Sequence, residues 1–126
     1  MPTTIAGWEL QVERGPGWLF VRPRWSEPDE SPEVHCLADQ IWSLLEQHFV
    51  YRVVLEVDEM GNLDPPALAQ LVKLYRRCHD HGGCMRLCGV NPYNRRLLRL
   101  RGLSGLFPAH ESPEEAVMGF SRRKPR

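Results

Sequence analysis

The chain has 126 residues, of which 42% are hydrophobic and 25% charged, with 16 basic and 16 acidic side chains. This is the composition of an ordinary globular protein, long enough to bury a core without disulfides or metal ions. No apolar run approaches the ~18 residues needed to span a bilayer, and the first residues do not resemble a signal peptide. We therefore expect a cytoplasmic protein with a single domain over residues 1–126, its core at about 8–120 and a basic tail at 121–126.

The charge is unevenly distributed along the chain. Residues 1–26 carry three basic and two acidic side chains (+1), residues 27–66 one basic and ten acidic (−9), and residues 67–126 twelve basic and four acidic (+8). Such asymmetry marks a charged partner surface, or two halves that face each other and cancel. The second interpretation is the simpler one.

Two strands and a turn open the chain. Residues 8–13 alternate strictly between apolar and polar side chains, as a half-buried strand does. Residues 14–17 (Arg-Gly-Pro-Gly) have turn chemistry, and residues 18–22 form the hairpin partner. An acidic, proline-rich loop follows over residues 23–32.

Helices and strands then alternate, which indicates one mixed sheet covered by helices. The expected elements are a helix over 31–48, a central strand over 51–57, a helix over 65–81 ended by Gly82-Gly83, a strand over 84–90, a helix from 91–92 with Leu97, Leu98 and Leu100 on its apolar side, a short edge strand at 106–107, and a last helix over 112–120.

The strand-to-helix corner at residues 53–68 organises this pattern. Residues 53–57 are mostly apolar and β-branched, as in a strand covered on both faces. Asp64 suits the N-cap of the next helix and Pro65 its first position. Leu63 and Leu68 are spaced to form a hydrophobic staple across that helix start.

The same corner resembles the STAS domain, the family of anti-sigma factor antagonist domains that are also attached to sulphate transporters. In the typical form, an apolar strand is followed by Asp-Ser-Ser-Gly-Leu, and a partner kinase phosphorylates the second serine. Here the matching residues are Asp64-Pro65-Pro66-Ala67-Leu68, so Pro66 stands at the phosphoacceptor position. Residues 82–91 resemble the family's glycine-led strand that ends in Gly-Val, and residues 95–108 its next helix and turn. The resemblance covers roughly residues 8–120.

The resemblance implies an α/β fold, with a STAS-like mixed sheet of four to five strands and about four helices. It also implies a non-catalytic regulator that binds a protein partner, such as an anti-sigma factor or serine kinase, as a monomer or weak homodimer. The expected partner-binding residues are Asp58, Glu59, Asn62, Leu63, Asp64, Pro65, Pro66, Ala67 and Leu68. The alternatives are an adaptor subunit of a signalling or transport complex, a small-ligand-binding domain with a pocket beside the corner, and a corner merely rigidified by its prolines.

With no hydroxyl at positions 65 and 66, the phosphorylation switch cannot operate. A helix start normally binds anions through its free N–H groups, but Pro65 and Pro66 remove two of these donors. Asp58, Glu59 and Asp64 add negative charge nearby. We expect this corner to reject phosphate, sulphate and nucleotide phosphates.

Other patterns do not assemble a site. The segment 78–88, with Cys78, His79, Asp80, His81, Cys84 and Cys88, superficially resembles a set of zinc ligands. Its side chains lie on a helix, at the helix end and on a buried strand, where they do not converge on one point, so structural cysteines and no metal or cofactor are expected. The arginine-rich segments at 95–101 and 122–126 are not accompanied by a nucleic-acid-binding motif, so we expect them to be solvent-exposed surfaces. No catalytic motif is present, and the five histidines are expected on helix surfaces and ends.

Overall fold

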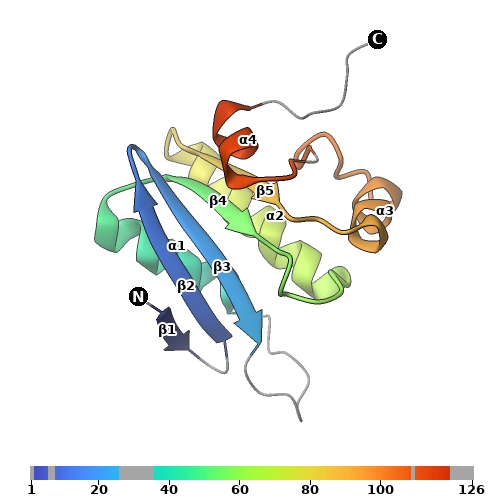
Figure 1. Cartoon of the computed structure of the whole chain (residues 1–126), viewed down its shortest axis with the longest axis horizontal. Coiled ribbons are helices and arrows are strands. Elements are labelled where there is room, and N and C mark those ends of the chain that lie inside the picture. The colour runs from blue at the N-terminus through green and yellow to red at the C-terminus, as the bar shows by residue number, and fades with distance from the viewer. Residues whose placement is uncertain (1, 6–7, 26–35, 109, 120–126) are drawn as a thin grey trace.

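The computed structural model describes residues 2–5, 8–25, 36–108 and 110–119, and shows a five-stranded mixed sheet with helices on both faces (Figure 1). The spatial order of the strands is β1-β2-β3-β4-β5, the same as their order in the chain. The pairs β1–β2 and β2–β3 are antiparallel, whereas β3–β4 and β4–β5 are parallel. The elements are β1 Pro2–Ile5, β2 Trp8–Gly15, β3 Trp18–Trp25, α1 Leu37–His48, β4 Arg52–Glu56, α2 Pro65–Asp80, β5 Cys84–Cys88, α3 Pro92–Leu100 and α4 Pro113–Met118.

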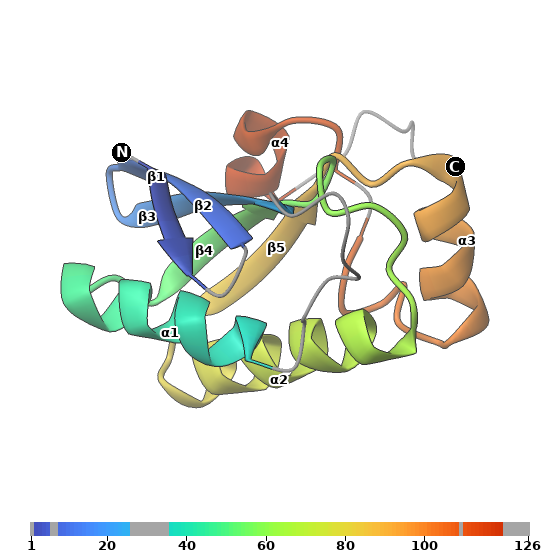
Figure 2. The same ribbon diagram turned by 90° about the horizontal axis from the view of Figure 1, so that it is seen from below.

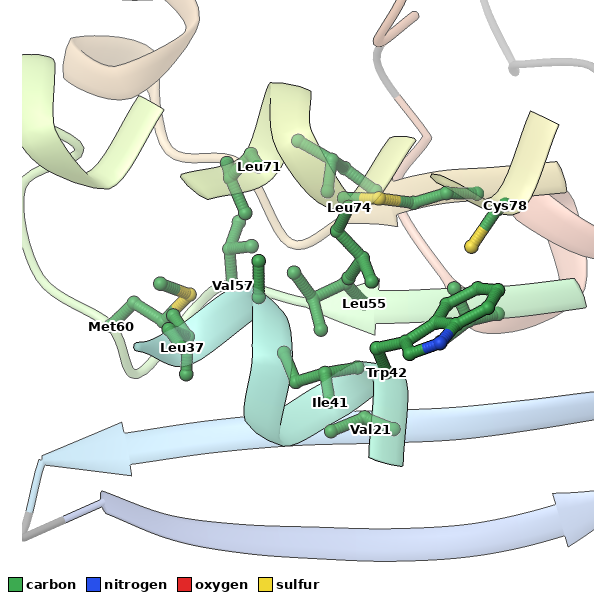
Figure 3. Packing of buried hydrophobic residues seen from close by; sticks show 14 of the residues in the cluster. Val21, Leu37, Ile41, Trp42, Leu55, Val57, Met60, Leu71, Leu74 and Cys78 are labelled. Atoms are coloured by element: carbon green, nitrogen blue, oxygen red, sulfur yellow. The ribbon is translucent and has the colours of Figure 1, made fainter. Parts of the chain in front are cut away.

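The helices are divided unequally between the two faces of the sheet. Helices α1 and α2 lie side by side under one face, α4 lies on the other, and α3 stands beyond the ends of the parallel strands (Figure 2). The main core fills the space between the sheet and the α1–α2 layer, where Val21 and Leu55 meet Ile41, Leu71 and Leu74 (Figure 3). A smaller apolar cluster under α4 contains Trp18, Val54, Cys88 and Ala116.

Strand β4 is covered from both sides, as its apolar sequence predicts. Val53 and Leu55 belong to the main core and Val54 to the smaller cluster, and all three are 0% exposed. Fully burying such a side chain stabilises a fold by ~1.5–3 kcal/mol. This strand therefore fixes where the chain leaves the sheet.

Most of the expected elements are confirmed, and so is the mixed sheet. The expected edge strand at 106–107 is wrong, because these residues lie in a turn. The backbone amides of Leu106 and Phe107 donate hydrogen bonds to the carbonyl of Leu103, at 3.1 and 3.0 Å. The ring of Phe107 packs edge-on against Tyr75. The fifth strand is β1 instead, which the sequence analysis did not predict. The proposed start of the first helix, the proline-rich loop after residue 25 and the tail at 121–126 lie outside the described residues.

The apolar side expected for α3 is only partly correct. Leu98 is buried, but Leu100 is 72% exposed because it points away from the sheet. The other inward position of α3 belongs to a polar residue, Asn94, which is 1% exposed. In the described part of the chain, no helix is long and apolar enough to cross a membrane.

The four cysteines are free thiols distributed over both faces of the sheet. Cys78, a residue of α2, lies in the main core, whereas Cys84 and Cys88 of β5 face the α4 side of the sheet. Burial raises the pKa of the Cys78 thiol and of the Cys88 thiol to about 12 in each case.

We expect Cys78 and Cys88 to resist alkylation in the native protein at pH 8, because only the thiolate is a strong nucleophile. Peptide mass spectrometry after a short iodoacetamide pulse checks this, with the half-buried Cys36 and Cys84 as internal references. Both buried thiols should react in urea. Rapid native labelling of Cys78 or Cys88 would contradict the burial described here.

Candidate functional site

The corner between β4 and α2 has the predicted geometry. Asp64 is the N-cap of α2, in extended conformation (φ −73°, ψ 175°). Its carboxylate accepts a hydrogen bond from the Ala67 amide at 3.4 Å, and its carbonyl accepts one from the Leu68 amide at 2.9 Å. Pro65 and Pro66 occupy the first two helical positions. Asp64, Pro65 and Pro66 are all exposed, so the helix start lies at the surface.

The nine residues expected at the partner surface divide into two groups. Six are exposed: Asp58, Glu59, Asn62, Asp64, Pro65 and Pro66. The other three, Leu63, Ala67 and Leu68, are buried in the main core. These three hold the loop and the helix start against the core and offer little side-chain surface to a partner.

A buried asparagine that the sequence analysis missed fixes the loop before α2. Asn94 of α3 accepts a hydrogen bond from the Leu63 amide at 2.9 Å and donates one to the Gly61 carbonyl at 2.9 Å. The backbone amide of Asn94 donates a hydrogen bond to the side chain of Asn91, the N-cap of α3, at 2.7 Å. The sequence offered one signal for this position. Asn94 lies four residues before Leu98, and residues at this spacing share one face of a helix. This contact, which we call the Asn94 clamp, joins the corner to α3.

Ion pairs tie the acidic side of the corner to β3. Arg22 lies 3.3 Å from Glu56 and 3.3 Å from Asp58. Burial lowers the pKa of Arg22, but the carboxylates of Asp58, Glu56 and Glu59 outweigh it and raise that pKa above its ordinary value. At the neighbouring turn, Gly89 has φ +74°, and a β-carbon there would lie 3.1 Å from Cβ of Asp58. A side chain at position 89 would therefore strain the backbone and crowd Asp58.

The chemistry of the helix start is unfavourable for anions. Two of the N–H groups at the start of α2 are missing because residues 65 and 66 are proline, and the N–H of Ala67 already donates a hydrogen bond to the Asp64 carboxylate. The carboxylates of Asp58, Glu59 and Asp64 are exposed around it. The geometry therefore supports the expectation that phosphate and sulphate do not bind at this corner.

The hollow beside the corner is small. It measures about 120 Å³ and is lined by Pro65, Leu68, Ala69, Val72, Arg101 and Leu103. Typical ligand pockets enclose ~300–1,000 Å³, so this hollow suits a single partner side chain better than a small-molecule ligand.

The remaining candidate residues do not come together. No group of three or more His, Cys, Asp or Glu side chains that could hold a metal ion occurs among residues 2–5, 8–25, 36–108 and 110–119. The expectation that all histidines lie on helix surfaces and ends is wrong for His110, which is 3% exposed in the segment before α4. The arginines of α3 and its end, at positions 95, 96, 99 and 101, are exposed.

We expect Asn94→Ala to lower the free energy of unfolding by about 1–3 kcal/mol, because it leaves the buried amide of Leu63 without an acceptor. Urea unfolding monitored by tryptophan fluorescence measures the change. Asn62→Ala is the control, since Asn62 lies exposed in the same loop and its loss should change stability by less than ~0.5 kcal/mol. Equal stabilities of the two variants would show that the Asn94 clamp does not hold the corner.

Comparisons with known proteins agree with this geometry. The family model described as "STAS domain" matches residues 31–116. An anti-sigma F factor antagonist from Paenibacillus polymyxa is 26% identical over 113 residues, covering 86% of this chain and 92% of that protein. The crystal structure of a putative anti-sigma factor antagonist from Thermotoga maritima has a TM-score of 0.71 at 14% identity, covering 90% of this chain and 95% of that one.

A further solved structure is that of the Bacillus cell fate determinant SpoIIAA in its phosphorylated form. It has a TM-score of 0.59 at 16% identity, covering 86% of this chain and 96% of that one. At these identities the two solved structures show the fold, while the family model covers well over half of the chain. The protein therefore belongs to the STAS domain family and is similar to its anti-sigma factor antagonists.

Proposed function

We propose that this chain is a non-catalytic, single-domain regulator of the anti-sigma factor antagonist type, which binds a protein partner through the corner and lacks the phosphorylation switch. The observation that carries the proposal is Pro66 at the exposed start of α2, at the position of the family's phosphoacceptor serine. Residues 58–68 contain no serine, threonine or tyrosine. The partner class proposed is an anti-sigma factor or a serine kinase of that kind.

The corner has the properties of a preorganised docking surface. Its exposed residues stand on a loop fixed by the Asn94 clamp and on a helix start fixed by two prolines and the Asp64 cap. A rigid surface loses less conformational entropy when it binds. The nearby hollow lined by Pro65, Leu68 and Val72 offers room for one apolar side chain of the partner.

The missing hydroxyl changes how such a surface is regulated. A phosphoserine adds a charge of about −1.5 to −2 that must be desolvated on docking and that repels acidic neighbours. Pro66 cannot acquire this charge, and Asp58, Glu59 and Asp64 give the corner a permanent negative charge instead. Binding is then constitutive, and control passes to the abundance of the partner.

We expect no phosphate on residues 58–68 after incubation with ATP and a cognate kinase, the kinase-fold protein encoded beside this chain or recovered with it from the host. Pro66→Ser restores a hydroxyl at the helix start and is expected to become labelled. The measurement is mass spectrometry of the peptide containing the corner.

Pro92→Ser is the matched control, because Pro92 is also exposed at the start of a helix but belongs to α3. It should stay unlabelled. Phosphate on the corner of the unaltered chain would overturn the absence of a switch, and equal labelling of both serine variants would show that the kinase does not recognise the corner.

We expect Glu59→Lys combined with Asn62→Lys to weaken partner binding at least tenfold, because both exposed side chains lie in the docking surface and form no hydrogen bond with a residue that the structure describes. Isothermal titration calorimetry with the partner recovered from the native host measures the change. The control is Glu46→Lys combined with Gln47→Lys, which makes the same change in charge at exposed positions of α1. Equal affinities of the two double variants would sink the assignment of the surface.

The identity of the recovered partner decides between this proposal and its alternative. An anti-sigma factor or kinase supports the regulator, whereas a membrane-transport or scaffold protein supports an adaptor subunit. A cytoplasmic location and a monomeric or weakly dimeric state stay predictions.

A further inference from the structure

The described elements cover only half of the sheet face opposite α1 and α2. Among them, helix α4 packs over β4 and β5 and leaves the outer side of the β2–β3 hairpin open (Figure 2). Arg86 of β5 holds α4 in this position by donating hydrogen bonds to the carbonyls of Ala116 and Val117, at 2.7 and 3.2 Å. A groove therefore runs between the hairpin and α4.

This groove, which we call the sheet-face groove, consists of two adjoining hollows of about 440 and 460 Å³. They share the side chains of Glu13, Phe20, Glu56 and Pro113. Each hollow is more than three times as large as the one beside the corner. Both fall in the ~300–1,000 Å³ range of small-molecule sites.

One part of the sheet-face groove is apolar. The ring of Phe20 lies next to Gly15, where a β-carbon would come within 2.7 Å of the ring, so the absence of a side chain at Gly15 leaves room for the ring. Val117 and Met118 of α4 face it across the groove, and Met118 is 67% exposed. These three side chains leave apolar surface open to a ligand.

Carboxylates from three elements converge on the same space: Glu13 from β2, Glu56 from β4 and Glu114 from α4. Glu56 is paired with Arg22, but Glu13 and Glu114 form no ion pair with any residue that the structure describes. Burial raises the pKa of Glu56, and the carboxylates of Asp58, Glu13 and Glu114 add to the rise against the opposing effect of Arg22. Among the charged groups that act on Glu56, three are carboxylates and one is the guanidinium of Arg22.

We propose that the sheet-face groove binds an amphipathic organic cation, an ammonium or guanidinium group carried on an aliphatic or aromatic body. The cationic group lies among Glu13, Glu56 and Glu114, and the apolar body lies on Phe20, Val117 and Met118. This combination resembles the usual composition of ligand sites, in which a few placed polar groups orient an apolar body.

An anion suits the groove less well. Two arginines line it, but Arg22 is held between Glu56 and Asp58, at 3.3 Å from each. The other arginine, Arg14, lies at the end of the hairpin and forms no ion pair with a residue that the structure describes. An anion would have to share the space with the carboxylates of Glu13 and Glu114, which costs free energy at short range.

The test is a titration of the ¹⁵N-labelled 126-residue chain with 2-phenylethylamine, followed by amide chemical shifts. Two analogues of the same shape, the neutral 2-phenylethanol and the anionic phenylacetate, are titrated in parallel. We expect saturable shifts at Gly15, Phe20, Glu56 and Val117 with the amine, with a dissociation constant in the millimolar range, as for a ligand of ~9 non-hydrogen atoms. Equal shifts with the alcohol, or no saturable shift with the amine, would overturn the proposal.

Charge variants separate the site from general attraction of cations to the chain. Glu13→Gln combined with Glu114→Gln is expected to weaken amine binding at least tenfold. Glu46→Gln combined with Asp80→Asn changes the net charge equally at exposed positions of α1 and α2 and should leave binding within twofold. Equal weakening by both pairs would contradict a built site, while well-dispersed spectra show that each variant folds.

The arginines and the lysine after Gly119 also carry guanidinium and ammonium groups on aliphatic side chains. The titration is therefore repeated on a chain that ends at Gly119. Amine binding of equal strength in the full and shortened chains supports a site for a free ligand. Binding that occurs only in the shortened chain would overturn that assignment and show that the groove is filled by the chain's own tail.

Discussion

Burial of β4 from both sides is the constraint on which the rest of the structure depends. Its three central side chains are fully buried, in alternation against the α1–α2 layer and against α4. A strand with no free face can only lie in the interior of the sheet, here between β3 and β5. The chain therefore emerges at the carboxyl end of the parallel strands, the edge where open α/β sheets place their sites. The loop and helix start at residues 58–68 lie there.

The corner is held by polar contacts as well as by apolar packing. The Asn94 clamp satisfies the backbone of Gly61 and Leu63, and Arg22 ties Asp58 to the end of β4. The buried hydrogen bond from the Leu63 amide to Asn94 selects one loop conformation, because breaking it leaves a desolvated group unpaired. The exposed face of Pro65 and Pro66 is thus presented in one orientation.

The two faces of the sheet differ in how completely the helices cover them. Two long helices close one face into the main core, whereas the six-residue α4 closes only the part of the other face above β4 and β5. The hairpin side chains on that face are left beside α4 and form the sheet-face groove. The groove is separated from the corner by the Arg22 ion pairs, so the Asp58–Arg22–Glu56 group lies at the boundary of both surfaces. A partner at the corner and a ligand in the groove would meet the same arginine.

The sequence by itself determined the hairpin, the two-sided burial of β4 and the starts of three helices, because strand alternation and N-caps are local. Asp64, Asn91 and Ser112 each cap a helix that has proline at its first position. Tertiary structure alone decided the pairing of β1, the turn at 106–107, the inward position of Asn94 and the sheet-face groove. The pairing of β1 with β2 and the turn at 106–107 involve near neighbours, but the Asn94 clamp and the Arg22 ion pair at the edge of the groove join residues far apart in the chain, 31 positions from Leu63 to Asn94 and 36 from Arg22 to Asp58. No local pattern encodes such contacts, since they depend on how the helices pack against the sheet.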